Sequence, residues 1–245
     1  HLIEQTAAAE LAEQTAQTTA AASLIQKYER RALVIATGAC AIHCRYCFRR
    51  HFPYGDAGLA PQRVREMLTA LAADPSLDEV ILSGGDPLSL STAKLGELTA
   101  QLAEIPHLRR LRIHTRLPVV LPERVDDALT DWLRTLPWPV VVVIHANHAN
   151  EFDSAVDAAL AQLRAAGATV LNQAVLLRGV NDNIEALVAL SQRGFAAGAL
   201  PYYLHQLDRV AGAAHFEVSD EEALVLHAAL IARMPGYLVP KLVRE

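Results

Sequence analysis

Short apolar segments rich in β-branched residues alternate with amphipathic segments along most of this 245-residue chain, and this alternation constrains the fold more than any other feature. Candidate strands lie at 32–37, 79–84, 108–115, 140–146, 168–174 and 199–204. Apolar residues recur every three or four positions in the intervening segments, which predicts helices at 61–75, 92–105, 122–136, 153–167 and 183–198. Such alternation implies right-handed βαβ crossovers and a parallel sheet, open or curled into a barrel.

The candidate strands and helices predict a single α/β core domain over residues 27–245, because no linker and no repeat interrupts the pattern. Six units fall short of the eight in a complete barrel, so the expected fold is a partial, TIM-like (β/α)6 barrel. A further helix at 220–234 and a short apolar segment at 237–243 follow the last unit. Residues 1–26, rich in Ala, Gln, Thr and Glu, are expected to form a peripheral N-terminal helical extension.

The amino-acid composition limits the classes of protein to which this chain can belong. Hydrophobic residues make up 52% and charged residues 20%, which suits a folded domain with a full core. A net charge of -5 argues against binding nucleic acid by phosphate neutralisation, although Arg45, Arg49 and Arg50 form a local basic cluster. The chain shows neither a run of about 20 apolar residues nor a secretory signal, which predicts no membrane span and a cytoplasmic location.

Polar residues gather where the predicted strands end. They occur in SGGDP (83–87), HTR (114–116), HANHANE (145–151), NQ (172–173) and HQLD (205–208). In parallel α/β folds, ligands bind at the carboxyl edge of the sheet, because loops from separate strands converge there. These segments therefore mark the expected ligand-binding edge.

The three cysteines of the chain, Cys40, Cys44 and Cys47, have C-x3-C-x2-C spacing just after the first predicted strand. An odd number so closely spaced argues against a disulfide framework and favours three thiolates on one metal centre. Zinc would need a fourth ligand, from His43 or His51. A four-iron cluster can instead leave one iron without a protein ligand. Cluster, zinc site and redox thiols all remain open on spacing alone.

C-x3-C-x2-C resembles the cluster motif of the radical S-adenosylmethionine (SAM) enzymes. A longer series of segments, from about Lys27 to Glu245, is similar to the lysine 2,3-aminomutase family: CRYCFRRHFPY, SGGDPL, RLRIHTRLPVVLPERV, NHANE, LNQAVLLRGVND, PYYLHQLD, GAAHFEVSDEEA and GYLVPKL. The most similar branch makes (R)-β-lysine for the modification of elongation factor P.

The resemblance implies an isomerase that converts L-α-lysine into (R)-β-lysine by moving the amino group from C2 to C3. Three thiolates, Cys40, Cys44 and Cys47, would hold a [4Fe-4S] cluster that cleaves SAM to a 5'-deoxyadenosyl radical. The substrate would be carried as an aldimine of pyridoxal 5'-phosphate (PLP). A free-lysine or glutamate 2,3-aminomutase is an alternative, and so is a non-catalytic iron-sulfur or zinc module.

The resemblance also assigns roles to single residues. The residues implied for SAM are Ser83, Gly84, Gly85, Asp86, His145 and Gln173. The glycines would let backbone approach SAM and Asp86 would accept from its ammonium, although Gly-Gly-Asp-Pro also suits an ordinary turn. The residues implied near PLP are Lys27 and Arg31. Arg49 would bind the substrate carboxylate, and Asp208 with Glu245 would hold the ε-ammonium, which favours lysine over glutamate.

The family's PLP Schiff-base lysine lies just beyond the position of Glu245, and none of the three lysines, Lys27, Lys94 and Lys241, matches it. No Schiff-base lysine is therefore assigned. Some relatives carry further cysteines for zinc, whereas this chain has no fourth cysteine, so the resemblance implies iron only. It also implies a reducing electron donor, a homodimer and an indirect link to the elongation factor P pathway.

Overall fold

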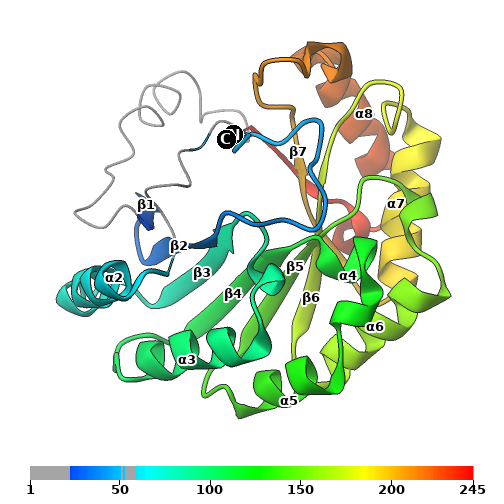
Figure 1. Ribbon diagram of the computed structural model, residues 1–245. Helices are drawn as coiled ribbons and strands as arrows, with labels where there is room; N and C mark the ends of the chain where they lie inside the picture. Colours follow the sequence, from blue (N-terminus) through cyan, green and yellow to red (C-terminus); the bar gives the residue numbers. More distant parts are fainter. Residues whose placement is uncertain (1–22, 51, 53–58, 245) are drawn as a thin grey trace.

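The computed structural model describes residues 23–50, 52 and 59–244, which form an eight-stranded sheet wrapped by helices (Figure 1). The strands follow one another in sequence order: β1 Leu24–Tyr28, β2 Arg31–Thr37, β3 Glu79–Gly84, β4 Arg110–Thr115, β5 Val140–His145, β6 Thr169–Val175, β7 Leu200–His205 and β8 Lys241–Val243. All neighbouring pairs from β2 to β8 are parallel, and β1 pairs antiparallel with β2.

Helices connect these strands across one face of the sheet. They are α2 Pro61–Ala73, α3 Thr92–Ala103, α4 Leu117–Val120, α5 Asp127–Thr135, α6 Ser154–Ala165, α7 Ile184–Ala196 and α8 Asp220–Arg233. Because the strand order never reverses, every right-handed crossover puts its helix on the same side. Figure 1 shows the result, a strongly curved sheet with helices around its outer face. The expected partial barrel of six β/α units is confirmed, with β8 added at its end.

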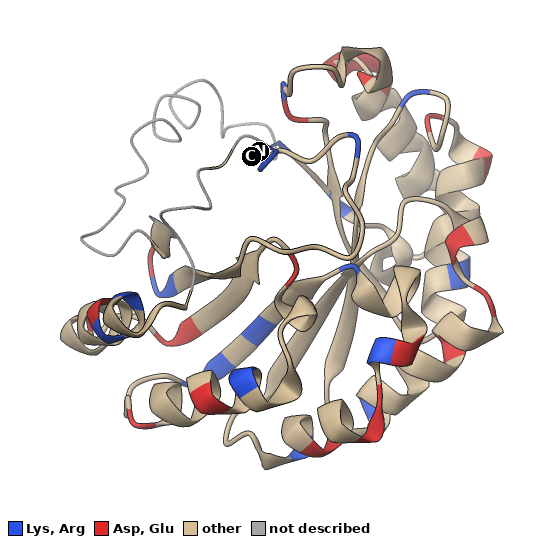
Figure 2. Ribbon diagram, viewed as in Figure 1, with Lys and Arg blue, Asp and Glu red and all other residues tan. Residues whose placement is uncertain are grey.

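The two faces of the sheet carry different side chains. The main apolar core lies between the sheet and the helices and includes Val80, Leu82, Ile113, Val142 and Leu160. The alternate strand positions point to the concave face, where polar residues are interspersed with apolar ones. Figure 2 shows basic positions within strands of the sheet and acidic positions mainly on helices and loops. The core thus stabilises the barrel from outside and leaves its inner face for polar groups.

Local signals set the helix starts. The side chains of Ser91, Asp126, Asp153, Asn183 and Ser219 each accept a hydrogen bond from a backbone N–H in the first turn of α3, α5, α6, α7 and α8. These caps satisfy donors that have no partner within the helix. At Ser219, Glu222 completes a capping box by accepting from the Ser219 N–H.

The structure corrects two expectations about elements. Residues 24–26, assigned to the N-terminal helical extension, belong to β1, so the proposed boundary at residue 26 falls within a strand. The helix expected at 122–136 is instead a 3-10 turn, Pro122–Arg124, followed by α5. The rest of the N-terminal extension, residues 1–22, lies outside the described residues. No helix in the described part of the chain is long and apolar enough to cross a membrane.

Candidate active site at the cysteine loop

Residues 38–50, here called the cysteine loop, leave β2 at the carboxyl edge of the sheet and carry the three cysteines. Tight turns shape the loop, since the Cys47 N–H donates to the Cys44 carbonyl over 3.2 Å and the Arg50 N–H to the Cys47 carbonyl over 3.1 Å. All three thiols are free and partly exposed. Burial, followed by the charge of Asp86 and the neighbouring cysteines, raises the pKa of Cys40 to about 11. A bound cation would reverse this penalty and release the proton.

The segment after β3 lies directly against the cysteine loop. The Gly85 N–H donates to the Thr37 carbonyl over 2.6 Å, and the Asp86 N–H to the Ala39 carbonyl over 2.8 Å. A Cβ on Gly84 would stand 2.5 Å from the Thr37 oxygen, and one on Gly85 would stand 2.3 Å from the Ala39 oxygen. The glycines were expected to let backbone approach SAM. In this structure Gly84 lets it approach the Thr37 carbonyl at the end of β2, and Gly85 lets it approach the Ala39 carbonyl of the cysteine loop. Their contact with SAM stays a prediction.

Asp86 is buried and already surrounded by donors. Its carboxylate accepts from Leu88 N over 3.0 Å, Thr115 Oγ1 over 2.7 Å, Arg116 N over 2.7 Å and Leu117 N over 3.2 Å. Burial raises the pKa of the Asp86 carboxyl above its ordinary value, although these hydrogen bonds oppose the shift. The expected partner was a SAM ammonium. The observed contacts fix the turn after β4 beside the cysteine loop, and the contact with the SAM ammonium stays a prediction.

His145 and Gln173 meet at the ends of β5 and β6. Gln173 Nε2 lies 3.0 Å from His145 Nε2, and a hydrogen bond there requires the ring nitrogen to be unprotonated. His114, from the end of β4, packs edge-on to His145 with 6.2 Å between ring centroids. Burial lowers the pKa of His145 to about 3 and that of His114 well below its usual value. His145 and Gln173 were assigned to SAM from the sequence, whereas His114 was named only within the HTR segment at this edge.

Arg49 and Ser83, predicted for substrate and for SAM, contact each other. Arg49 Nη1 donates to Ser83 Oγ over 2.6 Å and approaches the Gly84 carbonyl at 3.4 Å. The Arg49 guanidinium also lies 4.8 Å above the Phe48 ring. The structure thus joins the expected substrate arginine to the end of β3, next to the cysteine loop.

The other predicted residues are not all at this edge. Lys27 belongs to β1, and Arg31 begins β2, so both lie toward the opposite end of the barrel from the cysteines. The Arg31 guanidinium lies 4.1 Å from the centroid of the Tyr28 ring. Asp208 follows β7 and is partly buried. Glu245 lies outside the described residues, and so does His51, one of the expected zinc ligands.

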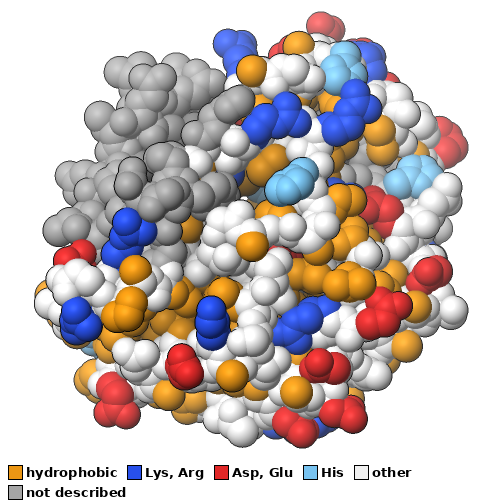
Figure 3. Space-filling model, in the orientation of Figure 1, with side chains coloured by type: hydrophobic (Ala, Val, Ile, Leu, Met, Phe, Trp, Pro, Cys, Tyr) orange, Lys and Arg blue, Asp and Glu red, His pale blue; other side chains and the backbone are white. Residues whose placement is uncertain are grey.

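The described residues contain no group of three Cys, His, Asp or Glu side chains already arranged to hold a metal ion. Two buried nitrogens near the loop, His114 Nε2 and Arg116 Nε, have no hydrogen-bond partner in the described part of the chain. On the face in Figure 3, basic side chains lie in both halves, whereas histidine side chains lie mainly in the upper half. The three free thiols could supply ligands to a cluster. The Arg116 Nε–H, which has no partner in the described part of the chain, could donate to an anionic ligand of that cluster.

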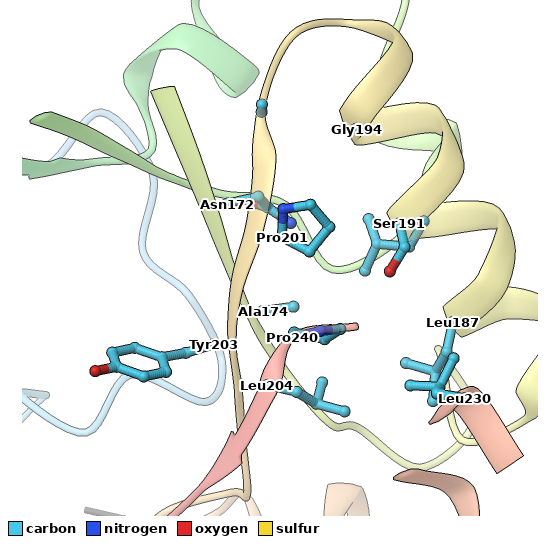
Figure 4. A pocket seen from close by; sticks show the side chains of 12 residues that line it. Asn172, Ala174, Leu187, Ser191, Gly194, Pro201, Tyr203, Leu204, Leu230 and Pro240 are labelled. Carbon is cyan, nitrogen blue, oxygen red and sulfur yellow. The ribbon is translucent and has the colours of Figure 1, made fainter. Parts of the chain in front are cut away.

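A small cavity lies elsewhere in the fold. It is bounded by β6, β7, α7, α8 and Pro240 and is lined mainly by apolar side chains such as Leu187, Leu204 and Leu230 (Figure 4). No cysteine and none of the predicted cofactor residues lines it. The chemistry-bearing residues lie instead along the edge described above.

Comparison with protein families matches residues 34–190 to the Radical SAM superfamily. Over 222 residues the chain is 51% identical to L-lysine 2,3-aminomutase from Escherichia coli, covering 91% of this chain and 65% of that protein. The protein of the same name from Haemophilus influenzae is 48% identical over 223 residues, covering 91% and 66%. The Clostridium subterminale L-lysine 2,3-aminomutase is 35% identical over 221 residues, covering 90% and 53%. The chain thus spans just under two thirds of its first two relatives.

Solved structures resemble the fold at low sequence identity. Streptococcus suis SuiB bound to S-adenosylmethionine has a TM-score of 0.62 at 14% identity, covering 97% of this chain and 55% of that one. A radical SAM methyltransferase from Sphaerobacter thermophilus has a TM-score of 0.59 at 19% identity, covering 90% and 68%. These similarities show the fold alone.

Proposed function

Since the chain belongs to the radical SAM superfamily, we propose that it is the core of an L-lysine 2,3-aminomutase, an isomerase that forms (R)-β-lysine from L-α-lysine. The observation that carries the proposal is the cysteine loop docked on the end of β3, within a chain 51% identical to one such enzyme over 222 residues. The (R) stereochemistry and the use of the product on elongation factor P rest on the sequence resemblance.

The superfamily uses a [4Fe-4S] cluster and SAM. Here Cys40, Cys44 and Cys47 would hold the cluster, and the ends of β3, β5 and β6 would border SAM through Ser83, Gly84, Gly85, Asp86, His145 and Gln173. When bound, the cluster and SAM supply a hydrogen-abstracting radical, and PLP supplies the carbonyl that carries the migrating nitrogen. The protein's part is to position these groups and to exclude water.

Several side chains have defined tasks in this proposal. Arg49 is tethered to Ser83 through Nη1 at the carboxyl edge, where its guanidinium would orient a substrate carboxylate. Neutral His145 accepts from Gln173 and presents no positive charge toward the sulfonium of SAM. Asp208, beyond β7, and Glu245 would offset the charge of the substrate ε-ammonium.

PLP fits this chain less completely. Arg31, at the amino-terminal end of β2, would contribute a cation for its phosphate, together with Lys27. Lys94 lies on α3 outside the barrel, and Lys241 begins β8 with an exposed side chain. No contact of these lysines supports a Schiff base, and we assign the anchoring lysine to neither.

The test is a product assay under strict anaerobic conditions. The chain would be reconstituted with iron and sulfide, reduced, and incubated with SAM, PLP and L-lysine, and the products separated by chromatography and mass spectrometry. We expect about four irons per chain, formation of 5'-deoxyadenosine and β-lysine. Cys44→Ala should lose the cluster and both products, because two thiolates cannot hold it.

Other outcomes would redirect the assignment. Turnover of glutamate in preference to lysine would indicate a glutamate aminomutase and refute the ammonium role of Asp208. Zinc without iron, or iron without SAM cleavage, would indicate a binding module and refute the radical reaction. Cleavage of SAM without β-lysine, restored in a C-terminally extended chain, would place the missing PLP lysine beyond Glu245.

We further propose a reducing compartment, the cytoplasm, because all three cysteines are free and an open cluster is sensitive to oxygen. An external one-electron donor is required by the chemistry. Assembly as a homodimer and a link to enzymes of the elongation factor P pathway are carried by the resemblance, and both can be tested with the assay protein by light scattering and by supplying its product to the modifying enzymes.

A further inference from the structure

Arg116, the residue directly after β4, reaches into the cysteine loop. Its Nη1 donates to Cys44 Sγ over 2.9 Å and to Tyr46 Oη over 2.8 Å. Its Nη2 forms an ion pair with Glu151 at 2.8 Å. One planar guanidinium therefore joins the loop that bears the sulfurs to the segment after β5.

The far side of this network is rigid. Glu151 accepts from the backbone N–H of Asn147 over 2.6 Å and of His148 over 3.1 Å. Asn147 Nδ2 donates to Tyr46 Oη over 2.5 Å, and Asn147 Oδ1 accepts from the Val175 N–H over 2.8 Å. The Tyr46 hydroxyl and the Glu151 carboxylate are thus each held by a further contact of their own.

The guanidinium is well shielded from water. The side chain of Arg116 is 19% exposed and that of Glu151 is 23% exposed. Burial opposes the charge of Arg116, but Tyr46, Cys44 and Glu151 around it raise its pKa above the ordinary value. A hydrogen bond from a permanently charged donor is about twice as strong as a neutral one, and low solvent access preserves that strength.

We propose that Arg116 is a positioning residue that fixes the Cys44 sulfur and raises the reduction potential of the cluster bound there, an inference that rests on the proposed cluster site. Glu151 and Tyr46 orient the guanidinium, so that one N–H stays directed at a single sulfur. Within the described part of the chain, Arg116 donates to Cys44 and to neither of the other two cysteines. Its effect is therefore specific to the part of the cluster that Cys44 would bind.

The expected direction follows from charge. Three thiolates on a cluster of charge +2 give a net charge of -1, and one electron from an external reductant brings it to -2 without forming or breaking a bond. A charge-assisted N–H donor to a ligand sulfur stabilises the more negative state, and hydrogen bonds to cluster sulfurs are a recognised determinant of potential. Without Arg116 the cluster should be harder to reduce.

The measurement is an EPR-monitored redox titration of the anaerobically reconstituted chain, with titanium(III) citrate as reductant. Arg116→Gln removes both the positive charge and the planar guanidinium, whereas Arg116→Lys keeps only the charge. Tyr46→Phe keeps the contact between Arg116 and Cys44 but removes the hydroxyl that accepts from the guanidinium. We expect the most negative potential in R116Q and intermediate values in R116K and in Y46F, which loses one of the two groups that orient the guanidinium. For R116Q the expected change is about tenfold in the reduction equilibrium, which is about 59 mV for one electron.

Arg124→Gln is the matched control. Arg124 is similarly shielded, with a side chain 15% exposed. It contacts the Leu88 and Leu90 carbonyls, Thr92 and Asp126, away from the cysteines. An R116Q potential equal to that of the unmodified chain at full iron content would overturn the proposal, and so would an equal shift in R124Q. If R116Q fails to load iron, the R116K potential decides. A failure of the unmodified chain to bind a cluster would instead refute the proposed function.

Discussion

At the level of single residues, the two glycines after β3 are set by the backbone they touch. Gly84 has a φ of 120°, which L side chains rarely adopt, and Gly85 has ordinary dihedral angles but no space for a Cβ. The Gly-Gly motif was recognised from the sequence, but its contact with the cysteine loop was not predicted. The same glycines could form a turn, contact a ligand or contact backbone, and only the packed structure shows which of these three roles applies.

We predict that Gly85→Ala destabilises the chain by about 1–3 kcal/mol and reduces iron loading, because the new methyl group would collide with the Ala39 carbonyl. Urea unfolding and iron analysis measure the two effects. Gly236→Ala is the control, since a Cβ there meets no atom within 4 Å, and it should change stability by less than about 0.5 kcal/mol. Equal effects in the two variants would contradict this account of Gly85.

Among the elements, β3 and β4 are joined inside the barrel by a bidentate ion pair. Arg112 donates from Nε to Glu79 over 3.0 Å and from Nη2 over 2.6 Å, and both side chains are 11% exposed. Arg112 Nη1 also approaches Tyr202 Oη at 3.3 Å. Sequence analysis treated both strands as apolar and missed this pair. The alternation of residues along a strand shows which face of the sheet a charged side chain points to. The residue it pairs with depends on the register between neighbouring strands.

Glu79→Leu should destabilise the fold by about 3–5 kcal/mol, because it leaves the Arg112 guanidinium buried without its counter-ion. Adding Arg112→Met should recover most of that loss, as two apolar side chains need no pairing. Chemical unfolding of both variants tests this. Arg134→Ala, which breaks the exposed Arg134–Asp131 pair, is the control and should cost less than about 1 kcal/mol. Failure of the double variant to recover would argue against an electrostatic origin.

For the molecule as a whole, stability should depend on pH through the histidines at the barrel mouth. Burial holds the pKa of His145 at about 3 and that of His114 well below the usual value, so the folded chain keeps both rings neutral where the unfolded chain binds protons. Their contribution is fully present above about pH 6.5 and is lost as pH falls toward 3.

Urea unfolding at pH 7, 6 and 5, without cofactors, should show stability falling on acidification, by up to about 1.4 kcal/mol per pH unit for each ring that stays neutral. His145→Gln should flatten this dependence, whereas His215→Gln removes an exposed histidine and should leave the slope unchanged. Equal stability at pH 7 and pH 5, or an unchanged slope in His145→Gln, would rule out this source of pH dependence.

The amino-acid sequence by itself determined the periodic βα pattern, the partial barrel and the three cysteines at the end of its first parallel strand, because hydrophobic periodicity and ligand spacing are local properties. Strand β1 was not predicted, since LIQKY has no clear alternation of apolar and polar residues. The contacts of Arg116 and the pairing of Arg112 with Glu79 needed the tertiary structure, as did the close approach at Gly85. Each joins residues more than thirty positions apart, and only the register of neighbouring strands decides which such groups meet.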